Sequence, residues 1–280
     1  MLIFDIGANK YKFVEACFEK HEKCSVIAVD PILPETLHPH HRQTVDSVFK
    51  RHGDRITVVQ AACGASSDEE ITFYMNLGEP GISTTSKAFL EGSRFALGND
   101  NILETYRGCV KRLDGAIAFP DLASFKTALL SSYPDIRSFL KDVQNVHNET
   151  RVVKATTLDD LIAEHGTPDL IKVDVEGYEA EVLKGLSQRV PKICFEWNEE
   201  MDSQLWESLD LLKELNYTQF GVSGYFVEED PPEKLSYDEG GDTYLLEPAA
   251  YYNYEETIAA LQAVIKVDRR INWGMAWTKE

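Results

Sequence analysis

The sequence predicts a mostly parallel β-sheet flanked by helices. Over the first 60 residues, short apolar runs at 2–5, 25–29 and 56–60 alternate with segments of helical pattern. The same alternation returns after residue 150. Strands and helices that alternate at this spacing build parallel sheets through right-handed crossovers. We therefore expect residues 1–280 to form a single α/β domain.

The individual elements follow from apolar periodicity and from capping residues. Residues 13–18 have the spacing of an amphipathic helix, and 70–75 alternate with period two, which predicts an antiparallel strand. Thr157 is a typical helix N-cap and Gly166 a typical helix end. Further strands are expected at 152–156, 170–175, 193–197, 217–222 and 243–246, with helices at 178–186, 205–215 and 255–267 and a loop at 228–242.

The segment 87–150 interrupts this regular pattern. Its apolar residues suggest several short helices, and Pro134 interrupts the last of them. We expect a helical insertion within the domain. It either closes over the site as a lid or serves only as helical packing.

Charge and cysteine content limit the partners and the compartment. The chain carries 28 Lys+Arg against 47 Asp+Glu, a net charge of −19, and has no basic stripe. Such a field repels a phosphate backbone, so we expect no nucleic-acid partner. Five scattered cysteines without a CxxC pair indicate reduced thiols. No apolar run approaches the roughly 20 residues of a membrane span. We expect a soluble, cytoplasmic protein with no membrane partner.

A first candidate site lies where the first strand turns into the first helix. Gly7 lets backbone approach a ligand there, and the helix N-terminus exposes N–H groups. Asp30 ends the second strand, where a carboxylate can accept both ribose hydroxyls. GxGxxG is missing, and Asp5 would repel a pyrophosphate but attract an ammonium group. The pattern favours an amino-acid nucleoside over NAD. The alternative is a structural turn with a solvated Asp30.

A second candidate site surrounds the strand at 170–175. With a period of two, Lys172, Asp174 and Glu176 lie on one side of the strand. A lysine inside a central strand needs a carboxylate partner, so Lys172 is interpreted mainly as structural. Asp174 and Glu176 reach the carboxyl edge, where we expect them to contact a substrate. The alternative is that the cluster only neutralises itself and positions the following helix.

Four motifs carry a family resemblance. In chain order they are Asp5-Ile6-Gly7-Ala8-Asn9, Val29-Asp30-Pro31, Thr157-Leu158-Asp159-Asp160 and Ile171-Lys172-Val173-Asp174-Val175-Glu176-Gly177-Tyr178-Glu179. They resemble the motifs of FkbM-type methyltransferases, which are class I S-adenosylmethionine-dependent enzymes. The resemblance covers roughly residues 1–80 and 150–222. It implies a Rossmann-like class I methyltransferase fold with a seven-stranded sheet, one strand antiparallel. It also implies O-methyl transfer to hydroxyls of sugars or secondary metabolites.

The resemblance further implies which residues bind the cofactor, S-adenosylmethionine. The loop after the first strand would line the methionine part with Asp5 beside it, Asp30 would hold the ribose, and two alanines after the third strand would lie near the adenine. The complete set is Asp5, Gly7, Ala8, Asn9, Asp30, Pro31, Ala61 and Ala62.

One position departs from the family pattern. The loop usually has a small residue, normally Gly, two places after the Asn, and this chain has Tyr11 there. The ring would either crowd the cofactor or swing out and leave binding intact.

Three weaker candidates remain. Glu196 and Asn198 end the strand at 193–197, where either can orient a substrate hydroxyl. Glu196 is interpreted as a general base if burial raises its pKa, or alternatively as a structural partner of Lys172. The segment 81–85 is interpreted as an ordinary turn rather than a binding loop. His38, His40 and His41 lack other ligands at suitable spacing, so no metal site is expected.

These observations lead to an S-adenosylmethionine-dependent O-methyltransferase as the first hypothesis. Its acceptor would be a small molecule or a glycan, and a carbohydrate hydroxyl is the first choice. Asp174, Glu176 or Glu196 would remove the hydroxyl proton, directly or through water. The alternative from another class is a methyltransferase-like fold that serves as a non-catalytic binding or scaffold module. An NAD-dependent enzyme explains Asp30 but not Asp5 or the missing glycines.

Overall fold

The computed structural model describes most of the chain. The described residues are 1–37, 39–67, 69–76, 80–92, 103, 106–108, 110, 112, 116–136, 138–140, 142, 148–225, 234–237, 247–265 and 273–280.

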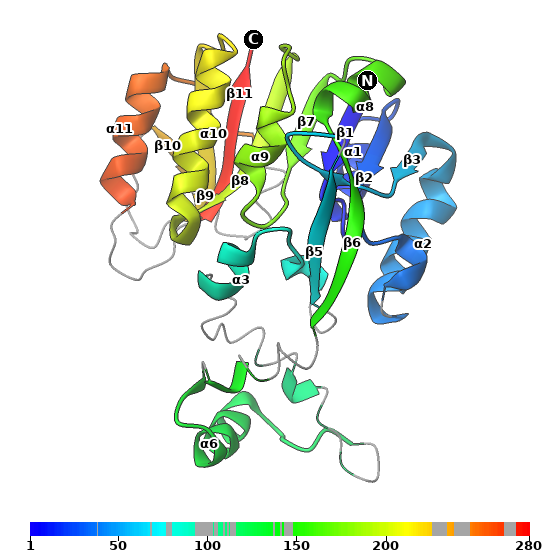
Figure 1. Cartoon of the computed structure of the whole chain (residues 1–280), viewed down its shortest axis with the longest axis vertical. Helices are drawn as coiled ribbons and strands as arrows, with labels where there is room; N and C mark the ends of the chain where they lie inside the picture. Colours follow the sequence, from blue (N-terminus) through cyan, green and yellow to red (C-terminus); the bar gives the residue numbers. More distant parts are fainter. Residues whose placement is uncertain are drawn as a thin grey trace.

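The strands of the described residues form two sheets (Figure 1). The main sheet contains β1 (Leu2–Ile6), β2 (Ser25–Val29), β3 (Ile56–Val59), β7 (Leu170–Val173), β8 (Lys192–Asn198), β9 (Gln219–Tyr225), β10 (Leu235–Tyr237) and β11 (Trp273–Lys279). The small sheet contains β4 (Ala62–Cys63), β5 (Glu70–Asn76) and β6 (Asn148–Thr156). The α-helices are α1 (Lys12–Lys20), α2 (Pro39–His52), α3 (Lys87–Gly92), α6 (Leu122–Ser132), α8 (Leu158–His165), α9 (Glu179–Lys184), α10 (Asp202–Glu214) and α11 (Tyr254–Val264).

The strand order places a topological switch point in the middle of the main sheet. The order is β10-β9-β11-β8-β7-β1-β2-β3, and β11 is antiparallel to both of its neighbours while the other pairs are parallel. The chain runs outward from β1 to β3 and then returns to place β7 on the other side of β1. Ligands of open α/β sheets bind at the carboxyl ends of the strands beside such a point.

Helices cover both faces of the main sheet. Apolar residues of α8, α9, α10 and α11 pack with Phe4 and Ile171 on one face. Those of α1 and α2 pack with Ile3 and Val26 on the other. The alternation of Ile3 and Phe4 between the two cores is the period-two pattern of a strand buried on both sides. The predicted α/β class with flanking helices is confirmed.

The small sheet and two helices lie beyond the carboxyl ends of the parallel strands (Figure 1). β5 pairs antiparallel with β6, as the period-two pattern at 70–75 predicts. α3 and α6 lie within 87–150, and their side chains contribute to a separate apolar cluster that includes Phe89, Phe125 and Leu129. The described part of 87–150 is therefore largely helical, but β6 already begins at Asn148. An insertion or lid at this place stays a prediction.

The main sheet differs from the prediction at its C-terminal strands. It has eight strands among the described residues rather than seven. β10 lies inside 228–242, which the two prolines and two glycines of that segment had predicted as a loop. β11 follows α11, which was expected to be the last element, and the predicted strand at 243–246 lies outside the described residues. β11 contains Gly274, a residue type that is unusual within a strand. Here it lets the backbone approach Ser223, whose carbonyl oxygen lies 2.1 Å from where a Cβ would stand.

The structure describes four of the five cysteines. Cys17, Cys24, Cys63 and Cys194 are buried free thiols, and Cys109 lies outside the described residues. Within the described part of the chain, no helix has the length and apolar character needed to cross a membrane.

Candidate active site

A cleft of about 260 Å³ opens at the carboxyl ends of the strands beside the switch point. Its walls come from the loops after β1, β2, β3 and β7. Most of the predicted site residues meet there. Those that line the cleft are Gly7, Ala8, Asn9, Asp30, Pro31, Ala61, Ala62, Asp174 and Glu176.

The loop after β1 is held in place by a close backbone approach. Gly7 has a φ of 83°, and its N–H donates to the Val29 carbonyl at 2.9 Å. A Cβ on Gly7 would stand 1.8 Å from the carbonyl oxygen of Asp174. Gly7 is therefore required by the contact between the β1 and β7 loops as well as by its positive φ.

Asp30 fastens the loop after β1 to the end of β2. Its Oδ2 accepts from the Asn9 N–H at 2.8 Å, and its Oδ1 accepts from the Ile32 N–H at 2.7 Å. Burial raises the pKa of Asp30 to about 6, against the lowering effect of these two backbone donors. Each carboxylate oxygen keeps a lone pair for a ligand hydroxyl. The solvated Asp30 of the alternative interpretation is wrong, since its side chain is buried.

Lys172 connects the two sides of the cleft from beneath. Its Nζ lies 3.0 Å from Asp5 Oδ1, 3.4 Å from Asp174 Oδ2 and 3.0 Å from the carbonyl oxygen of Gly7. Burial alone would favour the neutral amine, but the charges of Asp174 and Asp5 hold the pKa of Lys172 above its ordinary value. The predicted pairing of Lys172 with neighbouring carboxylates is present, and Lys172 also belongs to the lining of the cleft.

Asp5 lies behind the wall of the cleft. It is fully buried and does not belong to the lining among the described residues. Burial raises the pKa of Asp5, while Lys172 opposes that rise. Asp5 therefore acts on the cleft through Lys172 and through long-range charge.

Tyr11 does not crowd the cleft. It precedes α1 with a left-handed φ of 59°, and its ring is fully buried against Phe49, at a centroid distance of 5.1 Å. The ring is not part of the cleft lining, although Lys10 and Lys12 on either side of it are. Of the two orientations that the sequence allowed, the structure shows the one that leaves the cleft open.

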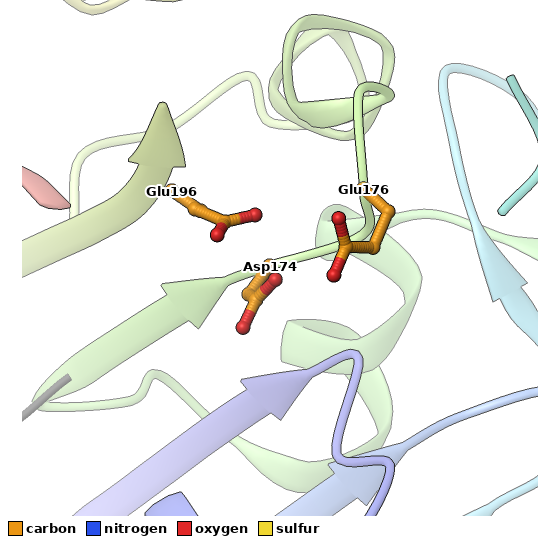
Figure 2. Close-up of side chains that lie close together, drawn as sticks. All are labelled: Asp174, Glu176 and Glu196. Carbon is orange, nitrogen blue, oxygen red and sulfur yellow. The ribbon is translucent and has the colours of Figure 1, made fainter. Parts of the chain in front are cut away.

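Three carboxylates gather at the edge of the cleft (Figure 2). One oxygen each from Asp174, Glu176 and Glu196 lies within 4.8 Å of the other two. Strand alternation does not cause this, because β7 ends at Val173 and both Asp174 and Glu176 belong to the following loop. Glu176 instead reaches the cluster through a left-handed backbone with φ of 57°. The sequence predicted that strand alternation places Asp174 and Glu176 on one side. The two side chains do lie together, but the loop after β7 brings them there and not the strand.

The carboxylates of this cluster strongly influence one another. Burial, followed by the charges of Asp174 and Glu176, raises the pKa of Glu196 well above its ordinary value. Lys172 forms ion pairs with Asp5 and Asp174, so its positive charge acts mainly on those two carboxylates. Carboxylate oxygens at this spacing are of the type that divalent cations use as ligands.

Asn198 caps the short helix that follows β8, because its Oδ1 accepts from the Met201 N–H at 3.0 Å.

Several lining residues were missed by the sequence reasoning. Gly81, Ser83 and Thr85 line the cleft, so the segment 81–85 is more than the ordinary turn expected.

Glu179 is buried beneath the loop after β7, where it accepts from the N–H groups of Val175 and Gly177. Burial raises the pKa of Glu179 to about 7. The sequence signals no more than an acidic first helical turn at this position.

The side chains of His40 and His41, and all of His38, lie outside the described residues.

Thr84 holds Glu176 in its unusual conformation. The buried Thr84 hydroxyl donates to the Glu176 carbonyl at 2.7 Å and accepts from the Ser86 N–H at 2.8 Å. Thr84→Val keeps the shape but leaves both backbone groups without this partner, which costs about 1–3 kcal/mol for each buried group. We expect a lower free energy of unfolding in urea titration, restored by Thr84→Ser, which keeps the hydroxyl. Equal stability of the valine and serine variants would refute this role.

The fold and this cleft define a class: an α/β protein with a cleft at the switch point of a mostly parallel sheet, where such folds bind ligands. A family model described as "Methyltransferase FkbM domain" matches residues 5–220. This match covers more than half of the chain, so the chain belongs to the FkbM methyltransferase domain family.

Two solved structures are similar to this chain at low identity. A methyltransferase FkbM from Methylobacillus flagellatus KT is 16% identical, with a TM-score of 0.39, over 81% of this chain and 40% of its own length. A precorrin-6y C5,15-methyltransferase from Geobacter metallireducens GS-15 is 10% identical, with a TM-score of 0.35, over 100% of this chain and 80% of its own. This chain thus spans less than half of the solved FkbM protein. No curated protein matches significantly.

Proposed function

We propose that this chain is an S-adenosylmethionine-dependent O-methyltransferase that acts on a hydroxyl of a sugar or small secondary metabolite. The proposal rests on one observation: the two candidate sites predicted from the sequence lie next to each other. The cleft lined by 7–9, 30–31 and 61–62 adjoins the carboxylates of Asp174, Glu176 and Glu196.

The cleft suits an amino-acid nucleoside. Asp30 has free lone pairs for ribose hydroxyls, and the small side chains of Ala61 and Ala62 leave room for a flat ring. The carboxylates of Asp174 and Glu176 complement a positive charge better than a pyrophosphate. S-adenosylmethionine supplies a methyl group on a positively charged sulfur. The residues on both sides of Tyr11 line the cleft while its ring does not, which supports a cofactor-binding protein over a blocked, non-catalytic one.

Glu196 is the proposed general base. A hydroxyl acceptor must lose its proton, and the best base has a pKa near the working pH. Burial and the charges of its carboxylate neighbours raise the pKa of Glu196 well above its ordinary value, which makes it a stronger base than an exposed glutamate. Asp174, held by Lys172, and Glu176 would orient the acceptor beside it. A neutral acceptor fits this acidic cluster better than an anionic one, which supports a carbohydrate or other polyol.

Calorimetric titration with S-adenosylmethionine and S-adenosylhomocysteine, with NAD as a control, tests the first half of the proposal. We expect micromolar binding of the first two ligands and none of NAD. A screen of neutral sugars and phenolic metabolites, with S-adenosylhomocysteine formation as the readout, tests the second half. Absence of binding at millimolar ligand would refute the enzyme and favour a scaffold. Binding with methyl transfer only to amines would refute the hydroxyl acceptor alone.

A further inference from the structure

A second cavity of about 260 Å³ lies at the opposite edge of the main sheet. Its residues come from the amino ends of β1, β7 and β8, from the end of the antiparallel β11 and from α1. It therefore opens at the edge away from the acidic cluster. The proposed methyl transfer uses none of the residues at its mouth.

The inner wall of this cavity is apolar and aromatic. Phe13, Cys17, Leu170 and Trp277 line it, and all four side chains are buried. The indole Nε1 of Trp277 is buried without a hydrogen-bond acceptor among the described residues. The wall suits a flat apolar group.

The mouth of the cavity carries two lysines, Lys20 and Lys192, with the carboxylate of Glu247 beside them. Lys192 Nζ lies 2.7 Å from Glu247 Oε1, and the Tyr251 hydroxyl donates to the same oxygen at 3.0 Å. Lys279 Nζ stands 3.8 Å above the ring of Tyr251. Partial burial raises the pKa of Glu247, but Lys192, Tyr251 and the charge of Lys20 lower it overall. Two lysines, Lys192 and Lys20, thus act on the Glu247 carboxylate.

The remaining acid of the lining faces other groups. Asp169 Oδ2 accepts from the Leu2 N–H at 2.7 Å and lies 4.0 Å from the amino group of Met1. Lys20 and Lys192 are the lysines that an anion at the mouth would meet, and Lys192 already pairs with Glu247.

We propose that this cavity binds a small amphipathic anion, with a flat apolar or aromatic body against Phe13 and Trp277 and an acidic group at Lys20 and Lys192. The site is separate from the proposed cofactor site and does not depend on it. Phe13 lines both cavities, and Lys172 Nζ lies 5.8 Å from the centroid of its ring. A molecule in the second cavity therefore rests on the same ring that borders the cofactor cleft.

The test uses the fluorescent probe 8-anilinonaphthalene-1-sulfonate, which is a flat apolar anion, and its neutral relative N-phenyl-1-naphthylamine. We expect one molecule of the sulfonate to bind per chain, at least tenfold more tightly than the neutral probe. Lys20→Glu reverses a charge at the exposed mouth and should weaken sulfonate binding about tenfold. Lys50→Glu makes the same change on α2, away from the cavity, and should leave binding unchanged.

Ala16→Phe provides a second test, because Ala16 lines the cavity and a larger side chain would fill it. We expect loss of sulfonate binding in this variant, with its melting temperature measured alongside to confirm folding. Saturating S-adenosylhomocysteine should leave the sulfonate stoichiometry at one. Full displacement by S-adenosylhomocysteine would place the probe in the cofactor cleft and overturn the proposal. Equal affinity of the sulfonate for wild type and Lys20→Glu, or equal affinity of the two probes, would overturn it as well.

Discussion

Replacement of Asp30 by Asn should reduce the affinity for S-adenosylhomocysteine about a hundredfold. The amide keeps the size of the side chain but has one oxygen, which must serve the N–H groups of Asn9 and Ile32 as well as the ribose. Hydrogen bonds to a charged acceptor contribute about 1.5–3 kcal/mol, and a hundredfold loss of affinity corresponds to about 2.7 kcal/mol. Calorimetric titration of both proteins at pH 7.5 measures the difference.

The same substitution should not destabilise the ligand-free protein at this pH. Burial holds the pKa of Asp30 at about 6, so the stability that the neutral carboxyl contributes is lost as the pH rises from about 4 through 6. At pH 7 the ionised group costs about 3 kcal/mol, and the neutral amide avoids this cost while losing one hydrogen bond. We expect a melting temperature within about 4 °C of wild type.

The pH dependence of binding gives a further control. Ligand affinity of the wild type should fall as the pH is lowered through about 6, because Asp30 becomes protonated. The affinity of Asp30→Asn should stay constant over this range. Asp46→Asn, which removes an exposed carboxylate on α2, should behave as wild type. Unchanged affinity of Asp30→Asn would show that Asp30 only fastens the loop after β1.

Replacement of Glu196 by Gln should lower kcat about 10²–10⁴-fold, the usual contribution of a general base. Affinity for S-adenosylhomocysteine should change little, since Glu196 does not line the cleft among the described residues. The wild-type kcat should rise with pH through the raised pKa of Glu196, and the variant should lose this dependence. Steady-state kinetics with an acceptor from the hydroxyl screen measure both effects.

An acceptor is not needed for a second measurement on the same variant. Because the pKa of Glu196 is raised in the folded protein, its contribution to stability is present at low pH and is lost as the pH rises through the folded-state value. Glu196→Gln should therefore raise the melting temperature more at pH 8 than at pH 5. Glu214→Gln, at the exposed end of α10, serves as the matched control. Equal kcat in wild type and Glu196→Gln would exclude Glu196 as the base.

The alternation of strands and helices was predictable because it is a local property of the chain. Thr157 caps α8 by accepting from the Asp160 N–H, and Gly166 follows the last residue of that helix, as the residue types indicate. β5 and β6 pair as the alternation at 70–75 predicts. β10 and β11 were not found, since each is stabilised by pairing with strands far away in sequence rather than by its own pattern.

The members of the candidate site were predictable from motif and strand position, but their arrangement was not. Gly7, Asp30 and Asp174 follow three strands whose carboxyl ends meet at one edge, so their convergence follows from the parallel sheet. The orientation of Tyr11 depends on the space beside Phe49 in α2, about 40 residues away, which no local signal specifies.

Charge and hydrophobic pattern in the sequence alone determined the α/β class, the residues at the strand ends and the acidic net charge of −19. Only the tertiary structure decided which carboxylates act together. Asp5 and Asp174 share Lys172, whereas Glu196 joins Asp174 and Glu176 from a neighbouring strand. The physical reason is that a pKa depends on burial and on charges within a few ångströms. Both are set by packing between segments that lie far apart in the sequence.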